Sequence, residues 1–248
     1  MAKKIKRQLG ELGKLNCACV IHDNKYDWQY VEKLYNGLSK NLSPEIVFHV
    51  YTEAERMVPS HFVKHCLEEW PGIRGPKKSW WYKIQLFNHQ QFNGDLLYFD
   101  LDTVITGNID WIWNLNAQRL NARRDFRHLF RPTCSTINSS VMWFNTQKFG
   151  YVYEQFNYSK VSERRIHWQG DQDYISDVVP ISDINFFPEN KILSYKWQVR
   201  EGGYNFKTRK SLNPGATTLI QKDTSVLIFH GKPDPGDCAD PVIRQYWM

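Results

Sequence analysis

The amino-acid sequence of 248 residues predicts an α/β protein in which helices flank a central, mostly parallel sheet. Short continuous apolar runs, as expected for strands buried on both faces, alternate with segments of helical periodicity. A strand, a helix and a second strand follow one another within about 35 residues, which is the arrangement of a βαβ unit. No repeat, low-complexity segment or linker divides the sequence. We therefore expect a basic lead-in over residues 1–14 and a single domain over residues 15–248.

The first part of the chain supplies the βαβ unit. Cys17–Ile21 predicts the first buried strand, and the alternation of side chains along a strand points its two cysteines to one face. After a loop, apolar residues at helical spacing predict a helix that begins at Trp28, with Asp27 as its cap. Glu45–Tyr51 predicts the second strand, and we expect the two strands to pair in parallel.

The remaining elements follow a basic loop that is rich in proline and glycine. A helix is predicted from about Ser79, with Trp80, Ile84 and Phe87 on one side. Asp95–Phe99 is the clearest buried strand in the chain. The later predicted elements are a strand, two helices and a last strand, at Ser139–Phe144, Thr146–Asn157, Gln172–Val178 and Ser225–Phe229.

Composition narrows the class of protein. The 15% of aromatic residues and 42% of hydrophobic residues exclude a disordered chain. The longest apolar run, Cys17–Ile21, is far shorter than the roughly 20 residues of a membrane-spanning helix, and no hydrophobic stretch follows the basic start. The net charge of +6 favours an anionic partner. Five cysteines without disulfide or metal spacing predict reduced thiols and a cytoplasmic protein.

Two carboxylates directly follow the clearest strand. In open α/β sheets, ligands bind beyond the carboxyl ends of strands, which is where Asp100 and Asp102 are expected. Such neighbouring carboxylates repel each other and any phosphate unless a divalent cation lies between them. Aspartate oxygens suit Mg²⁺ or Mn²⁺, which can bridge to a diphosphate. The alternative is that the two aspartates cap the next turn, as Asp often does, and an Asp-x-Asp pattern alone does not decide.

Several stretches resemble a known family when they are taken in order. The chain carries Trp80–Lys83, Leu97–Asp110, Ile137–Asn145, Gly170–Asp173 and Ile228–Pro233. Together they resemble the nucleotide-sugar glycosyltransferases of the GT-A fold, above all the retaining group that includes glycogenin and bacterial lipopolysaccharide galactosyltransferases. The resemblance covers roughly residues 80–233, while residues 17–52 match as a generic nucleotide-binding half. It implies a single GT-A-like, Rossmann-like domain.

This sequence departs from the family pattern at two places. Ser140 stands where the family has a glycine, so the shape of the sugar or acceptor pocket differs. Lys232 lies two residues beyond His230, and Asp234 follows Pro233, whereas the family places several residues between the histidine and the lysine and a tryptophan after the Lys-Pro pair.

The resemblance implies an activity and a set of site residues. The activity would be metal-dependent transfer of a hexosyl group, with retention, from a nucleoside-diphosphate sugar (a UDP-sugar) to a saccharide or other hydroxyl acceptor. A mixed set of oxygen and nitrogen ligands favours Mn²⁺, with Mg²⁺ as the alternative. The implied metal ligands are Asp100, Asp102 and His230; the nucleotide contacts are Asp23, Asn24, Tyr26, Lys83, Asp100 and Lys232, with Arg74 or Lys78 adding charge; the catalytic candidates beside the donor sugar are Asp171 and Gln172.

Each of these residues also has a structural alternative. His230 could be a strand-end histidine with a satisfied hydrogen bond, Asp171 a helix cap, Lys83 a solvated helix residue, and Tyr26 a wall of the core.

Two other functions compete with sugar transfer. A haloacid-dehalogenase-type phosphatase would use Asp100 as nucleophile and Asp102 as general acid/base. Such enzymes normally open with this strand, however, whereas here a βαβ unit precedes it, and they give His230 no role. A non-catalytic carbohydrate-binding protein would use the aromatic residues as sugar-stacking surfaces, but it leaves the acidic pair without a role.

Arginines concentrate in one later stretch. No nucleic-acid-binding motif accompanies them, so we expect a solvated face or a dock for an acidic acceptor in place of a nucleic-acid site, and a peripheral membrane contact stays open. The arginines are Arg119, Arg123, Arg124, Arg127 and Arg131.

Overall fold

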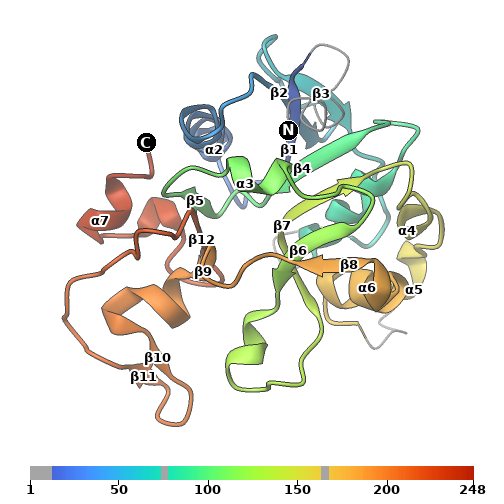
Figure 1. Cartoon of the computed structure of the whole chain (residues 1–248). Coiled ribbons are helices and arrows are strands. Elements are labelled where there is room, and N and C mark those ends of the chain that lie inside the picture. The colour runs from blue at the N-terminus through green and yellow to red at the C-terminus, as the bar shows by residue number, and fades with distance from the viewer. Residues whose placement is uncertain (1–12, 74–77, 163–167) are drawn as a thin grey trace.

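The computed structural model describes residues 13–73, 78–162 and 168–248, so most of the expected lead-in and Arg74 lie outside the described residues (Figure 1). A seven-stranded sheet has the strand order β3-β2-β1-β4-β7-β6-β8. Its strands are β1 (Leu15–Val20), β2 (Ile46–Thr52), β3 (Val63–Cys66), β4 (Asp95–Phe99), β6 (Leu120–Arg124), β7 (Ile137–Asn145) and β8 (Ile184–Phe186).

The central sheet is mostly parallel, as predicted. Strands β3, β2, β1 and β4 run in one direction, and β6 and β8 are parallel to each other. Strand β7 is antiparallel to both of its neighbours, β4 and β6. A smaller sheet lies beside the main one, with the order β5-β12-β9, and β10 and β11 form a hairpin. These strands are β5 (Thr103–Ile105), β9 (Ile192–Ser194), β10 (Tyr204–Asn205), β11 (Lys210–Ser211) and β12 (Val226–Ile228).

The βαβ unit forms as the periodicity predicts. Helix α2 (Trp28–Asn41) begins after Asp27, whose side chain accepts a hydrogen bond from the Gln29 amide at 3.0 Å and so satisfies one free N–H of the first turn. The helix buries Val31 and Leu34 against the face of β1 that carries Cys17 and Cys19. Both cysteines are fully buried, as expected, and all five cysteines are free thiols.

The helical segment before β4 corrects one expectation. Residues Ser79–Phe87 form a 3₁₀ helix, which has three residues per turn, so Trp81, Ile84 and Phe87 share the buried side. Trp80, which was predicted on that side, is 38% exposed.

The later elements differ in length from their predictions, and strand β7 extends beyond the predicted Ser139–Phe144 at both ends. The expected long helix over Thr146–Asn157 is reduced to α4 (Tyr151–Glu154), whereas α6 (Asp171–Val178) agrees with its prediction. The last predicted strand, β12, forms but belongs to the small sheet, where it pairs antiparallel with β5 and parallel with β9. The other helices are α3 (Asp110–Trp113), α5 (Tyr158–Ser162) and α7 (Pro241–Arg244).

Helices cover both faces of the main sheet (Figure 1). Helix α2 packs in one hydrophobic cluster with Cys17, Val50 and Phe99, while the 3₁₀ helix, α4 and α6 pack in a second cluster with Ala18 and Tyr98. A third cluster joins the small sheet to α7. Within the described ranges, no helix has the length and hydrophobicity needed to cross a bilayer.

Candidate functional site

The loops that follow β1 and β4 lie side by side, because these strands are neighbours in the sheet and pair in parallel, Ala18 opposite Tyr98. The Tyr26 hydroxyl in the first loop donates a hydrogen bond to Asp102 Oδ2 in the second at 3.0 Å. Between the loops is a first hollow, lined by Val20, His22, Lys25, Tyr26, Ser79, Trp80, Lys83, Tyr98, Asp100, Leu101 and Asp102.

Asp100 is held by a buried lysine. Lys83 is 6% exposed, and its Nζ lies 2.9 Å from Asp100 Oδ1, which also accepts a hydrogen bond from the Tyr98 hydroxyl at 2.5 Å. Burial alone would raise the pKa of Asp100, but the Lys83 ammonium and these hydrogen bonds hold it below its usual range. Asp100 is therefore ionised at neutral pH. The alternative of a solvated Lys83 is wrong.

Asp102 has the opposite electrostatics. Burial and the charge of Asp100 raise the pKa of Asp102 to about 7. Asp102 thus resists ionisation because of its burial and because the ionised Asp100 lies next to it. A divalent cation bound between the two carboxylates would relieve their repulsion and favour ionisation of both. The chemistry of Asp100 and Asp102 therefore fits the hard cation that the sequence predicts.

A second hollow lies on the other side of Lys83. The Lys83 Nζ is 3.2 Å from Asp171 Oδ2, and both contact Ser139, whose Oγ lies 3.0 Å from Lys83 Nζ and donates to Asp171 at 2.5 Å. Lys83 thus joins the strand-end acid of β4 to the first residue of α6. This hollow is lined by Asp125, Phe126, Arg127, Asn138, Gln169, Gly170, Asp171, Gln172, Asp173, Trp197 and His230.

Gln172 is oriented by a residue that the sequence did not single out. Its Nε2 donates to Asp125 Oδ2 at 2.6 Å, and Asp125 also accepts from the Arg127 amide at 2.7 Å. Arg127 in turn contacts Asp173 at 3.0 Å. Asp125 is buried directly after β6. In the sequence, Asp125 is recognisable only as an aspartate at the end of a strand. This pattern is too common to mark it as a site residue.

His230 lies close to the acidic pair along the backbone. The Phe229 amide donates to the Asp102 carbonyl at 3.1 Å, and His230 follows. Its Nε2 is 2.6 Å from Ser194 Oγ, and its ring stacks on Phe126 at 5.7 Å. Burial, aided by Lys196, lowers the pKa of His230 to about 4, so the imidazole is neutral at pH 7, which is the form that binds metals.

The three predicted metal ligands are not preassembled. In the part of the chain that the structure describes, the one group of three His, Cys, Asp or Glu side chains with all donor atoms within 4.8 Å is His22, Asp23 and Glu53. Glu53 already binds Arg56 at 2.8 Å, so this group has its cation. Ligation by His230 through Nε2 would require it to leave Ser194.

The predicted nucleotide contacts differ in placement. Asn24 is exposed, and Asp23 has a positive φ of 56° and donates its amide to Glu53. The Tyr26 ring packs on Tyr30 at 4.6 Å with Lys25 Nζ over it at 4.5 Å, so stacking on a base would displace one of them.

The predicted basic contacts are turned elsewhere. Lys232 is paired with Asp234 at 2.6 Å and Asp237 at 3.0 Å, and Lys78 donates to the Gly72 carbonyl at 2.9 Å.

The arginine cluster is largely structural, which corrects the expectation of one solvated or docking face. Arg123 is fully buried, with Nε donating to the Ile192 carbonyl at 3.0 Å. Arg124 binds the Cys134 carbonyl at 2.7 Å, and Arg119 binds the Ile184 carbonyl at 3.0 Å.

Comparison with known proteins gives structural relatives. A scan of protein-family models finds no match, and a search of curated proteins finds none. Among solved structures, an active-site mutant of LgtC matches with a TM-score of 0.66, 13% identity and 94% of both chains covered. The galactosyltransferase LgtC in complex with donor and acceptor sugar analogs matches with a TM-score of 0.63, 13% identity and the same coverage. The glycosyltransferase GlyE of Streptococcus pneumoniae TIGR4 matches with a TM-score of 0.65 and 12% identity over 95% of this chain, which spans 60% of GlyE. The chain therefore has the fold of these glycosyltransferases.

Proposed function

We propose that this chain is a metal-dependent glycosyltransferase that moves a sugar from a nucleoside-diphosphate sugar, a UDP-sugar, to a saccharide acceptor, with retention. The carrying observation is the Asp100–Lys83–Asp171 cluster, which joins the acidic pair of the first hollow to the second hollow. The proposal is supported by the fold, by LgtC having been solved with donor and acceptor sugar analogs, and by the family resemblance of the motifs.

The first hollow provides the chemistry for a diphosphate. A divalent cation on Asp100 and Asp102 would act as a Lewis acid on the leaving nucleoside diphosphate. Lys83 adds a positive charge that is already desolvated and fixed by two carboxylates and Ser139, so it costs little reorganisation during the reaction. Neutral His230 is available as the nitrogen ligand after it leaves Ser194.

The second hollow provides the chemistry for the sugars. Asp171 is ion-paired and fixed at the start of α6, and the Gln172 amide donates to Asp125, which leaves the Gln172 carbonyl oxygen free to face a sugar. These groups orient the transferred sugar, and they hold its reacting carbon at the boundary between the two hollows.

The phosphatase alternative is less well supported. Asp100 would be the nucleophile, but its carboxylate is occupied by Lys83 and the Tyr98 hydroxyl. Strand β4 is the fourth strand among the described residues and has an antiparallel neighbour, β7. A non-catalytic carbohydrate-binding protein would leave the charged cluster of the first hollow unexplained.

Nucleotide titration tests the proposal. UDP and GDP are titrated calorimetrically into the protein with and without Mn²⁺, and into Asp102→Asn and His230→Ala. The exposed residues Asp223 and His61 offer matched controls, Asp223→Asn and His61→Ala. We expect Mn²⁺-dependent UDP binding that both site variants lose and both controls keep. Turnover of a phosphate ester without any nucleotide binding would overturn the proposal.

A further inference from the structure

An aromatic surface extends outward from the second hollow. It consists of Phe130, Trp197, Tyr204 and Phe206, and it is built from the β6–β7 loop and the segment around the β10–β11 hairpin, which project from the same side of the molecule (Figure 1). Phe206 lies 4.5 Å from Phe130, 5.2 Å from Trp197 and 5.3 Å from Tyr204 between ring centroids. Trp197 also lines the second hollow and contacts His230 at 4.3 Å.

The backbone holds this surface in place. Gly203 has a φ of +106°, and a Cβ there would lie 3.2 Å from the Trp197 carbonyl, so glycine permits the hairpin to pack on the Trp197 segment. At the tip, Asn205 Oδ1 accepts hydrogen bonds from the amides of Lys207 at 2.9 Å and Thr208 at 3.1 Å. The aromatic surface is therefore formed before any ligand arrives.

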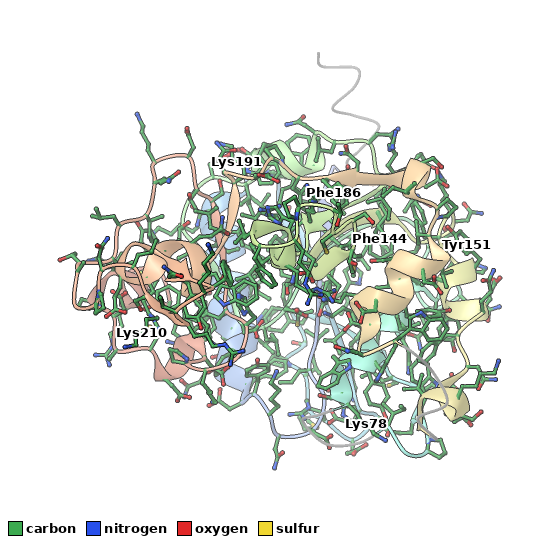
Figure 2. All side chains as sticks on the ribbon, turned by 90° about the horizontal axis from the view of Figure 1, so that it is seen from below. Lys78, Phe144, Tyr151, Phe186, Lys191 and Lys210 are labelled. Atoms are coloured by element: carbon green, nitrogen blue, oxygen red, sulfur yellow. The ribbon has the colours of Figure 1, made fainter. Side chains whose placement is uncertain are left out.

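Positive charge concentrates beside these rings. Residues 195–212 contain five Lys or Arg and one Asp or Glu. Three of the bases, Lys207, Arg209 and Lys210, are exposed at the hairpin, and no described carboxylate lies within ion-pair distance of them. Lys210 lies toward one edge of the molecule, away from Tyr151 at the opposite edge (Figure 2). The three residues are called the basic tip below.

We propose that the aromatic surface and the basic tip bind the acceptor, and that the acceptor is an anionic saccharide carrying phosphate or carboxylate groups. This inference rests on the proposed function. Aromatic rings take up the apolar faces of sugar rings, and exposed Lys and Arg bind phosphate and carboxylate. Along the surface, the second hollow comes first, then the aromatic rings, then the basic tip. The reacting sugar would therefore lie in the second hollow, and the charged groups of the saccharide would lie further from it, at the basic tip.

A membrane surface fits these observations less well than a saccharide. Insertion into a bilayer requires an exposed apolar face next to the bases. Of the four rings, Phe130 alone is more than about a third exposed, at 41%, because the others pack on one another. Leu129 and Leu212 beside them are 37% and 54% exposed, so apolar surface does lie next to the bases, and the vesicles named below test it. The rings are also continuous with the second hollow, because Trp197 belongs to both. A membrane surface would have no use for that hollow, whereas a saccharide could enter it.

Matched saccharides test the proposal by direct binding, without turnover. The probes are oligogalacturonate and its methyl ester, and a maltooligosaccharide with and without a phosphate group. Vesicles of phosphatidylglycerol and of phosphatidylcholine test the membrane. The charge variant is Lys207→Gln/Lys210→Gln, and Lys40→Gln/Lys160→Gln is its control, since both control lysines are exposed elsewhere. Phe130→Ala tests the rings, with Met57→Ala at an 88% exposed site as its control.

We expect at least one anionic saccharide to bind more tightly than its neutral match. The charge variant should lose about tenfold in affinity for it, because it removes two surface ion pairs that are each worth up to roughly fivefold in an equilibrium constant. The loss should shrink at high salt. Phe130→Ala should weaken the charged and neutral chains alike, and both controls should bind as the wild type does.

Three results would overturn the proposal: equal binding of charged and neutral saccharides, no saccharide binding at all, or charge-dependent binding confined to phosphatidylglycerol vesicles. UDP binding with Mn²⁺ is measured on the same variants. If UDP binding is intact but anionic and neutral saccharides bind equally, this inference fails and the proposed function stands. If the wild type does not bind UDP with Mn²⁺, the proposed function fails whatever the saccharides do.

Discussion

Replacing Asp102 by asparagine should stabilise the metal-free protein, although it removes a predicted metal ligand. The pKa of Asp102 is raised from 3.8 to about 7 by burial and by Asp100. Each tenfold change in proton affinity is worth about 1.4 kcal/mol, so ionisation of Asp102 costs the folded state up to about 4 kcal/mol. Solvent reaches part of Asp102 and screens this cost. We therefore expect Asp102→Asn to raise the free energy of unfolding by about 1–2 kcal/mol at pH 8.

The pH dependence fixes the sign of this effect. Below about pH 4, Asp102 is protonated in both the folded and the unfolded chain, and the variant should match the wild type. As the pH rises from about 4 to about 7, the unfolded chain loses this proton more readily, so the wild type loses stability that the variant keeps. Urea unfolding in EDTA at pH 5 and pH 8 measures the difference.

Asp100→Asn is the matched control for this prediction. Asp100 binds Lys83 and the Tyr98 hydroxyl, so its neutralisation leaves the buried ammonium with less compensation and should destabilise the protein by about 1–3 kcal/mol. Added Mn²⁺ should stabilise the wild type and neither variant. If Asp102→Asn destabilises the metal-free protein at pH 8 as much as Asp100→Asn does, the repulsion between the two carboxylates is not what we infer.

Three further predictions follow from other contacts. Lys83→Met should destabilise the protein by about 3–5 kcal/mol in urea unfolding, because it leaves Asp100 and Asp171 buried without their cation; unchanged stability would contradict the shared ion pair. Burial and His65 lower the pKa of His49 from 6.5 to about 3, so the wild type should lose stability as the pH falls below about 6.5, and His49→Gln should flatten that slope in thermal unfolding. Asp125→Ala should slow sugar transfer at least about tenfold and leave UDP binding within about twofold, because it frees the Gln172 amide without touching the first hollow; an equal loss of UDP binding would place Asp125 on the nucleotide.

Local patterns in the sequence predicted the elements that a local signal specifies. The apolar run at Cys17, the periodicity after Asp27 and the strand before Asp100 each form where expected, since burial on both faces or on one stripe shows in consecutive residues. The 3₁₀ helix was misread because its period of three differs from the assumed 3.6 by less than one residue per turn. Strand β12 was found, but its sheet depends on pairing with distant strands, which no local pattern contains.

The candidate site was predictable to the same extent. Asp102 and Asp171 line the two hollows, as their predicted positions after a strand and at a helix start imply, while their roles stay predictions. Asp125 was missed because its contact with Gln172 spans 47 residues of sequence. Lys232 has the family's residue type, but Asp234 and Asp237 are close enough to pair with it, so its charge is not directed at the hollow.

The burial of Lys83 explains why the two hollows should act as one site. A lysine side chain at 6% exposure is stable as a cation when carboxylates surround it, and here Asp100 and Asp171 supply the charge from different elements, β4 and α6. A diphosphate bound to a metal on Asp100 would compete with Asp171 for the Lys83 ammonium. Under the proposed function, donor binding in the first hollow would therefore weaken the ion pair that Lys83 makes with Asp171 in the second. Asp171, the proposed neighbour of the transferred sugar, would then respond to whether the diphosphate is present.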